Sequence, residues 1–302
     1  MPLFSVIVPS YNRAELIGRT IDSVLSATGA DLEVIVVDDG STDTTLDVLA
    51  RYGEKVRVLR RENRGPGAAR NCGLRAATAD YVAFLDSDDI WFPWTIETYS
   101  RVIEKHNRPA FIAGRPFIFE SDNVVLPTTP EPLQTLEFPD YFASGDKWRW
   151  YSASSFVMLR EPLLAAGGFA DEWINGEDAH AALRMGDAGK FVQITSPFTF
   201  GYRRHAGSAM SNQQRNFLGV RQMIADERAG RFPGGPRRAR ERKTIIGDFA
   251  RPLCVSLLAV NRTWAWDLYR MTFLWNLALC RWKFLGGFPA TALWTRFRTG
   301  NG

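Results

Sequence analysis

Residues 81–89 read Y-V-A-F-L-D-S-D-D, and this stretch decides the fold. Its first five residues have the β-branched and aromatic character of a buried strand, and they run directly into Asp86, Asp88 and Asp89. Three carboxylates so close together repel one another unless a cation lies among them, and oxygen ligands suit Mg²⁺ or Mn²⁺. Short acidic motifs also recur by chance, so a solvated turn that caps the next helix explains this stretch alone equally well.

Length and composition indicate an ordinary globular chain. Its 302 residues are enough for one large α/β domain and an appendage, and 45% of them are hydrophobic and 23% charged. Cys72, Cys254 and Cys280 are an odd number of cysteines at no metal-ligand spacing, which favours a reducing compartment. No signal peptide precedes the first apolar run, so we expect a cytoplasmic protein.

The net charge of +4 is unevenly distributed. Residues 231–302 carry thirteen Lys and Arg against three acids, a balance of +10, whereas residues 1–230 carry −6. Five of the ten tryptophans also lie in the basic part. We therefore divide the chain into a body, 1–228, and a basic, Trp-rich helical tail, 229–302.

Four apolar segments near the N-terminus are each followed by polar side chains. They cover residues 3–9, 32–37, 56–59 and 81–85, and helical patterns separate them. In a parallel sheet wound right-handed, the residues after the strands gather at one edge, where the ligand crevice lies. The sequence therefore predicts an α/β domain with a ligand site built from Tyr11, Asn12, Asp38, Asp39, Arg64, Arg70, Asp86, Asp88 and Asp89.

The segment G-P-G-A-A-R-N at residues 65–71 superficially imitates a dinucleotide-binding fingerprint. That fingerprint belongs to the first strand-helix turn, its third glycine is replaced here by Arg70, and Pro66 removes a backbone N–H. A helix beginning at this segment suits an anionic or nucleotide ligand, and close packing of the helix explains the glycines equally well.

Four segments carry a resemblance to a known family: S-V-I-V-P-S-Y-N-R, V-I-V-V-D-D-G-S-T-D, N-R-G-P-G-A-A-R-N-C-G and Y-V-A-F-L-D-S-D-D-I-W. In this order and spacing, over about the first 95 residues, they resemble the N-terminal half of the family 2 glycosyltransferases. The resemblance implies a GT-A fold, with a mostly parallel, Rossmann-like sheet flanked by helices. It divides the body into a nucleotide-binding half, 1–95, and an acceptor half, 96–228.

The resemblance also implies roles for individual residues. Those that would bind the nucleotide sugar are Pro9, Tyr11, Asn12, Asp39, Arg64, Arg70 and Asp86. Asp86 and Asp88 would form the Asp-x-Asp pair, with Asp88 as the direct ligand of Mn²⁺ or Mg²⁺. Such an ion stabilises the charge that grows on the diphosphate leaving group.

A candidate base lies in G-E-D-A-H-A-A-L-R at residues 176–184. Asp178 at the start of a helix is explained in isolation by the helix dipole. A Glu-Asp pair behind the G-G-F segment at 167–169 resembles the family's catalytic position, which would make Asp178 the base and Glu177 its neighbour on the acceptor side.

The segment Y-R-R-H-A-G-S-A-M-S at residues 202–211 resembles the family's region where a histidine joins the metal or diphosphate. His205 is then a metal ligand and Arg203 a phosphate contact, although a lone histidine is more often an ordinary surface residue. The Q-x-x-R-W motif of processive synthases is absent, which favours transfer of a single sugar.

Between the two halves we expect a helix over 92–107, strands over 110–119 and 152–159, and an irregular, proline-rich loop over 123–146. Aromatic residues after this loop, Trp148, Trp150 and Tyr151, fit a sugar platform or an ordinary core.

The tail has no clean apolar run of about twenty residues, because charged residues interrupt it. Interleaved aromatic and basic residues suit a helix lying on an anionic membrane, and a helical bundle or homo-oligomer interface fits them equally well. Nucleic acid is disfavoured as a partner because the apolar content is large.

Taken together, the sequence predicts an inverting, metal-dependent glycosyltransferase. It would transfer one sugar from a nucleoside diphosphate sugar to a glycan or lipid-linked acceptor, in the cytoplasm or at the inner face of the membrane. The alternative is a non-catalytic nucleotide-sugar-binding or assembly protein of the same fold. A nucleotidyltransferase is disfavoured, since it would offer a glycine-rich basic loop where this chain has Ser10, Tyr11 and Asn12.

Overall fold

The computed structural model describes residues 3–121, 124–145, 147, 152–204 and 211–299. The chain forms two compact units. The first contains residues 1–141, 148–173 and 177–208, and the second contains 142–147, 174–176 and 209–302.

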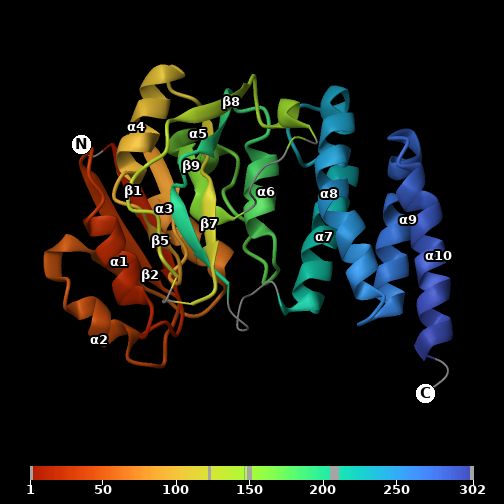
Figure 1. The fold of residues 1–302 in the computed structure, drawn as a ribbon, viewed down its shortest axis with the longest axis horizontal. Coiled ribbons are helices and arrows are strands. Elements are labelled where there is room, and N and C mark those ends of the chain that lie inside the picture. The colour runs from red at the N-terminus through yellow and green to blue at the C-terminus, as the bar shows by residue number, and fades with distance from the viewer. Residues whose placement is uncertain (1–2, 122–123, 146, 148–151, 205–210, 300–302) are drawn as a thin grey trace. The chain divides into compact units, whose positions relative to one another are not determined.

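The first unit is built on an eight-stranded sheet of order β3-β2-β1-β4-β9-β6-β10-β8 (Figure 1). Pairings among β1, β2, β3 and β4 are parallel, β9 runs antiparallel between β4 and β6, β10 is parallel to β6, and β8 is an antiparallel edge strand. The sheet is thus mostly parallel in its N-terminal half, as predicted. Its strands are β1 (Phe4–Ser10), β2 (Leu32–Asp38), β3 (Arg57–Arg60), β4 (Tyr81–Phe84), β6 (Phe111–Ala113), β8 (Gln134–Phe138), β9 (Phe156–Leu159) and β10 (Phe191–Ser196).

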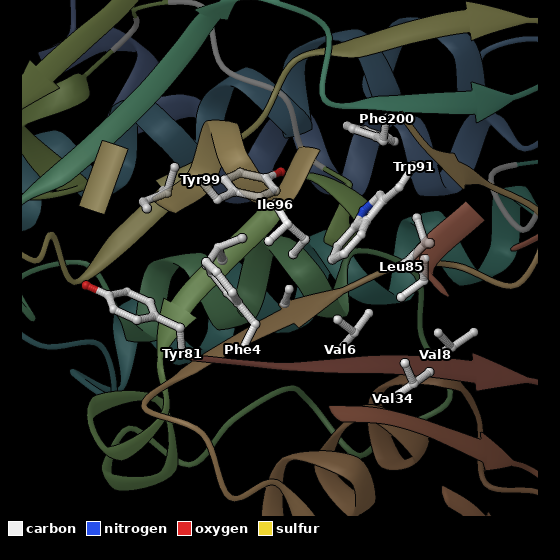
Figure 2. Packing of buried hydrophobic residues seen from close by; sticks show 14 of the residues in the cluster. Phe4, Val6, Val8, Val34, Tyr81, Leu85, Trp91, Ile96, Tyr99 and Phe200 are labelled. Carbon is white, nitrogen blue, oxygen red and sulfur yellow. The ribbon is translucent and has the colours of Figure 1, made fainter. Parts of the chain in front are cut away.

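Helices flank this sheet, which explains why β1 and β2 read as continuous apolar runs. Val6 and Val8 belong to the core cluster that also contains Ile21 of α1 and Ile96 of α4 (Figure 2). Ile7 points the other way, where a Cβ on Gly73 of α3 would approach its Cγ2 to 2.5 Å. The helices of this unit are α1 (Ile17–Leu25), α2 (Thr45–Ala50), α3 (Pro66–Ala76), α4 (Thr95–Lys105), α5 (Arg160–Ala165) and α6 (Glu177–Arg184).

The strand expected over 110–119 is two strands in two sheets, so that prediction was wrong in detail. β6 ends at Ala113, and β7 (Pro116–Phe119) joins a small sheet of order β5-β11-β7, with β5 at Ile90–Trp91 and β11 at Phe200–Arg203. The chain changes sheet at Gly114, where a Cβ would lie 2.2 Å from Thr199 Oγ1. A glycine is therefore required at this crossing point.

The irregular loop expected over 123–146 contains a strand, β8, which the sequence analysis missed. β8 pairs with β10 along the edge of the sheet, and its side chains are mostly exposed. An exposed edge strand between prolines lacks the apolar alternation that marks a strand in sequence.

The second unit is helical. Its helices are α7 (Gln213–Arg228), α8 (Ala239–Leu257), α9 (Arg262–Ala278) and α10 (Trp282–Thr299), drawn from teal for α7 to blue for the others in Figure 1. Buried Arg242 of α8 donates to buried Glu227 of α7 at 2.5 Å. This unit includes α7, whereas the tail predicted from the sequence begins at residue 229. The predicted division into domains stays a prediction. None of the described helices combines the length and the apolar content needed to cross a membrane.

Candidate active site

The first two strands end together at one edge of the main sheet. Their parallel register places Pro9 opposite Val37 and Ser10 opposite Asp38, and the N–H of Asp39 donates to the carbonyl of Ser10 at 2.8 Å. The polar residues that follow these strands are therefore neighbours, as predicted from the strand pattern.

Asn12 joins the turn after β1 to the turn after β2. Its side-chain oxygen accepts from the backbone N–H groups of Thr42 at 2.8 Å and Asp43 at 3.4 Å, while its own N–H donates to Ser41 Oγ at 2.9 Å. Asn12 has a φ of 51°, a left-handed conformation that asparagine tolerates well. The Asn12 side-chain oxygen thus joins the two turns at this edge of the sheet. The neighbouring Tyr11 side chain is 43% exposed and faces outward.

Asp39 supports the turn between β3 and α3. Its buried carboxylate accepts from the backbone N–H groups of Arg64 at 3.2 Å and Gly65 at 2.7 Å, and it forms an ion pair with Arg61 at 3.1 Å. The Arg64 side chain is exposed. The carboxylate of Asp39 therefore anchors the start of α3. Contacts of Asp39 and Arg64 with a nucleotide stay predictions.

The acidic turn after β4 is held by two residues from distant parts of the chain. Ser154 accepts from the N–H of Asp86 at 3.0 Å and donates to Asp89 Oδ2 at 2.6 Å. Arg203 donates its backbone N–H to Asp89 Oδ1 at 2.9 Å and its Nε to the carbonyl of Asp88 at 3.2 Å. Both residues thus lie at the turn, and Arg203 is placed beside the predicted Asp-x-Asp pair.

The three acids of this turn have different surroundings. Asp89 is buried, and its pKa is raised well above the usual value by burial and by the charges of Asp88 and Asp86. The side chains of Asp86 and Asp88 are only partly buried, and Asp88 lies 3.6 Å from Arg13. Asp89 therefore supports the turn, while the side chains of Asp86 and Asp88 keep part of their surface exposed.

Arg70 bridges the acidic turn and the start of α6. Its buried guanidinium donates from Nη2 to Asp86 at 2.5 Å and from Nη1 to Glu177 at 2.6 Å, and it lies 5.4 Å from the centre of the Phe169 ring. Both carboxylates raise the pKa of Arg70, so it stays charged. Because the side chain is enclosed by these partners, its geometry suits positioning of α6 better than direct contact with a nucleotide.

α3 also contacts the segment before α6, through hydrogen bonds of Asn71 and close packing at Gly67. The Asn71 side chain donates to the carbonyl of Phe169 at 3.0 Å and to Asp171 at 2.7 Å, and it accepts from the N–H of Phe169 at 2.9 Å. A Cβ on Gly67 would lie 2.0 Å from the carbonyl oxygen of Ala170, so only glycine fits. The G-P-G-A-A-R-N segment is therefore a docking surface for residues 169–171, in line with close packing of this helix.

Asp178 lies next to this network at the first turn of α6. Burial and the nearby charge of Glu177 raise the pKa of its carboxyl to about 7, and the positive charge of Arg70 opposes this shift. Asp178 Oδ1 accepts from the N–H of Ala179 at 2.7 Å. A carboxylate with a pKa near 7 can take up a proton at neutral pH, which is what a general base must do. Glu177, by contrast, is ion-paired to Arg70.

An exposed aromatic residue stands beside the start of α3. A Cβ on Gly65 would lie 3.8 Å from the indole of Trp173, whose side chain is 43% exposed. Trp173 was not among the residues predicted from the sequence, and neither were Asn71, Ser154, Arg13 and Arg61. Arg61 follows directly after β3, so its position at a strand end is a signal that could have predicted it.

The residues at the turn fit a divalent ion in chemical type. Asp86 and Asp88 offer carboxylate oxygens, which hard cations such as Mg²⁺ and Mn²⁺ prefer, and substrate phosphates commonly complete such sites. Within the described ranges, no group of three metal-ligating side chains converges. Four predicted candidates, Trp148, Trp150, Tyr151 and the metal ligand His205, lie outside the described residues.

Comparisons with known proteins agree with this arrangement. The model of the family "Glycosyl transferase family 2" matches residues 5–165. An uncharacterized glycosyltransferase of Nostoc sp. is 43% identical over 165 residues, covering 53% of this chain and 51% of that protein. The chain spans about half or less of the length of the first curated relatives that it matches.

Two relatives have named activities. The Escherichia coli protein WfaP, a UDP-Glc:alpha-D-GlcNAc-diphosphoundecaprenol beta-1,3-glucosyltransferase, is 28% identical over 220 residues, covering 72% of this chain and 84% of WfaP. A validoxylamine A glucosyltransferase of Streptomyces hygroscopicus is 41% identical over 220 residues, covering 61% of this chain and 51% of that enzyme.

Solved structures share the fold. S. aureus TarS 1–349 in complex with UDP-GlcNAc matches with a TM-score of 0.60 at 18% identity, covering 98% of this chain and 92% of TarS 1–349. The mannosyltransferase PcManGT of Pyrobaculum calidifontis, in complex with GDP-Man and Mn²⁺, matches with a TM-score of 0.55 at 22% identity, covering 97% and 86%. The sheet is that of a GT-A glycosyltransferase. Since the family model covers more than half of its 302 residues, this chain belongs to glycosyl transferase family 2.

Proposed function

We propose that this protein is an inverting glycosyltransferase that moves one sugar from a nucleoside diphosphate sugar to an acceptor hydroxyl, with Asp178 as the base. The observation that carries the proposal is the bridge from Asp86 through Arg70 to Glu177. This bridge joins the acidic turn of the nucleotide-binding half to the helix that bears a carboxyl with a raised pKa. In this proposal, leaving-group stabilisation and proton acceptance share one network of buried ion pairs.

We assign the donor to the sheet edge. The Tyr11 ring offers a face on which a nucleotide base can stack, Arg13 lies 3.6 Å from Asp88, and Arg64 supplies further positive charge after β3. A UDP-sugar is the donor class we favour, since the name of WfaP specifies UDP-Glc and TarS was solved with UDP-GlcNAc.

Asp86 and Asp88 are the side chains that would hold a divalent ion at this edge, as the oxygen donor set allows. When bound, such an ion supplies Lewis-acid stabilisation of charge on the diphosphate. Mn²⁺ is present in the PcManGT complex, which supports testing Mn²⁺ beside Mg²⁺.

Asp178 would accept the proton of the attacking hydroxyl. In a single displacement the attack comes from the face opposite the leaving diphosphate, so the anomeric configuration inverts. Arg70 keeps Glu177 ion-paired and so fixes the first turn of α6, from which Asp178 projects. We favour a sugar on a lipid diphosphate as the acceptor class, because WfaP acts on a diphosphoundecaprenol-linked sugar.

Single-turnover transfer tests the proposal. The protein is incubated with radiolabelled UDP-glucose or UDP-GlcNAc, a synthetic GlcNAc-diphospho-lipid acceptor and Mn²⁺, and product is compared for wild type, Asp178→Asn and Asp187→Asn. Asp187 is an exposed acid beyond the end of α6 and serves as the matched control. We expect Asp178→Asn to lose about a hundredfold or more in rate, with donor binding retained, as for loss of a general base.

A chain that binds the donor but transfers no sugar to any acceptor, in wild type as in Asp178→Asn, would instead fit a non-catalytic binding protein of the same fold. Normal transfer by Asp178→Asn would disprove the assignment of the base. Thermal shift with each donor, measured with and without Mn²⁺, separates loss of binding from loss of chemistry.

A further inference from the structure

The helical unit exposes a concentration of large apolar side chains. Over half of the exposed large hydrophobic residues in the described chain fall between residues 255 and 294. Leu274 is 71% exposed and Trp282 is 61% exposed, and they are accompanied by Phe273, Leu277, Leu293 and Trp294. Single exposed apolar residues are common, but a group of this density marks a surface that meets another apolar phase or partner.

Exposed residues at helical spacing form one stripe on each helix of the α9–α10 hairpin. On α9, exposed Arg270, Leu274 and Leu277 are spaced by four and three residues. On α10, Lys283, Gly287, Ala290 and Trp294 are exposed at spacings of four, three and four. Such spacing puts each set on one face of its helix, so apolar and basic groups share the same outer stripe.

Residues on the inner faces of α9 and α10 hold the hairpin together. The rings of Tyr269 and Phe288 stack with centroids 4.7 Å apart, and the Tyr269 hydroxyl donates to the carbonyl of Leu285 at 2.8 Å. Arg262 donates to Thr295 Oγ1 at 3.1 Å. The inner faces therefore join the two helices, while Leu274, Leu277 and Lys283 remain exposed to solvent.

Positive charge accompanies the exposed apolar surface. The sequence of α9 and α10, residues 262–299, contains six Lys and Arg and a single acid, Asp267. A hollow of about 300 Å³ along α9 is lined by Arg262, Thr263, Trp266 and Arg270. Arg262 is already bonded to Thr295, but the Arg270 guanidinium, 3.9 Å from Asp267 and 73% exposed, suits a phosphate group whose attached chain continues into an apolar layer.

We propose that the outer surface of the α9–α10 hairpin docks on an anionic lipid bilayer. Leu274, Trp282 and Trp294 enter the headgroup region, and Arg270 and Lys283 contact lipid phosphates. A second copy of the chain fits less well, because pairing this surface with itself would bring its excess positive charge together. Nucleic acid would leave the exposed leucine and tryptophan side chains in water.

Vesicle flotation of the full chain tests this surface, with phosphatidylcholine vesicles compared with an equal mixture of phosphatidylcholine and phosphatidylglycerol. We expect binding to the anionic vesicles that weakens as salt is raised. The double variants Leu274→Ser with Trp282→Ser, and Arg270→Glu with Lys283→Glu, should each weaken binding about tenfold or more.

The matched controls are Val125→Ser, an apolar residue 87% exposed in the other unit, and Arg101→Glu on α4, and both should bind as wild type does. Unchanged thermal unfolding of the double variants shows that the fold is intact. Equal flotation of wild type and both double variants would overturn the proposal. So would a lipid-free dimer that Leu274→Ser with Trp282→Ser dissociates, since a second copy would then cover the surface. No donor or acceptor is needed, so the outcome is independent of sugar transfer.

Discussion

The guanidinium of Arg70 donates to the carboxylate of Glu177 at 2.6 Å, although the two residues lie 107 positions apart in the sequence. The same guanidinium holds Asp86 at 2.5 Å, so one buried cation serves two acids. Glu177 directly precedes Asp178, whose pKa is raised to about 7. This contact makes the first turn of α6 dependent on α3.

Replacing Arg70 should change the acidity of Asp178 as well as stability. Arg70→Met leaves Glu177 without its buried counter-charge, which should cost about 3–5 kcal/mol of unfolding free energy. Because Arg70 lowers the pKa of Asp178, its loss should move the midpoint of the rate against pH upward. Arg70→Lys retains the charge and should shift the midpoint less, although it cannot donate to both acids as a planar group.

The measurement is kcat/KM for sugar transfer between pH 5 and 9, beside urea unfolding of each variant. A purely structural role would lower stability without moving the pH midpoint. That result would remove Arg70 from the list of residues that position the base.

Asp178 should make transfer pH-dependent near neutrality. Its pKa of about 7 means that the carboxylate form, and with it kcat/KM, should rise as pH passes from 6 to 8. The raised pKa also makes stability depend on pH, because the folded protein prefers the protonated carboxyl. The stabilisation from the protonated form is complete below the unfolded pKa near 4 and is lost as pH rises through about 7.

Asp178→Asn removes the charge and should therefore be more stable than wild type at pH 8, by about 1–3 kcal/mol, and no more stable at pH 4. Urea unfolding at the two pH values measures this difference. An Asn variant that loses stability at pH 8 would show that the carboxylate is stabilised in the fold, against the raised pKa.

The sequence was sufficient to predict the parallel half of the sheet and its edge. β1, β2 and β4 are buried on both faces, so each appears as an apolar run, and the residues after them meet at one edge for reasons of topology. The family and the GT-A fold are confirmed. The roles of the individual site residues stay predictions.

Contacts between residues far apart in the sequence could not be predicted from the sequence. Ser154 holds Asp89 from 65 positions away, and no local pattern marks a serine as the partner of a buried acid. The split at Gly114 depends on Thr199, and β8 is stabilised by β10 rather than by its own composition. Each of these features depends on a partner in another element, which periodicity along one segment does not reveal.

Gly67 should be intolerant of a side chain. Gly67→Ala would place a Cβ 2.0 Å from the carbonyl oxygen of Ala170, so α3 must move away from residues 169–171. We expect a loss of about 1–3 kcal/mol in unfolding free energy, together with slower transfer, because Arg70 and Asn71 leave their partners. Gly18→Ala in α1 is the control, since its Cβ would be at an ordinary 3.5 Å from the Tyr52 hydroxyl. Comparable losses in the two variants would show that the close approach to Ala170 is unimportant.

Trp173 should contribute to acceptor binding rather than to chemistry on the donor. Its indole lies against Gly65 and keeps 43% of its surface exposed, four residues before Glu177 and five before Asp178. An aromatic face of this kind stacks on sugar rings, so Trp173→Ala should raise the acceptor KM about tenfold, equivalent to about 1.4 kcal/mol, and leave donor hydrolysis unchanged. Leu136→Ala, on the distant edge strand β8 with 44% exposure, controls for loss of an exposed apolar side chain. If Trp173→Ala slowed donor hydrolysis and left the acceptor KM unaltered, the indole would belong to the donor side of the site.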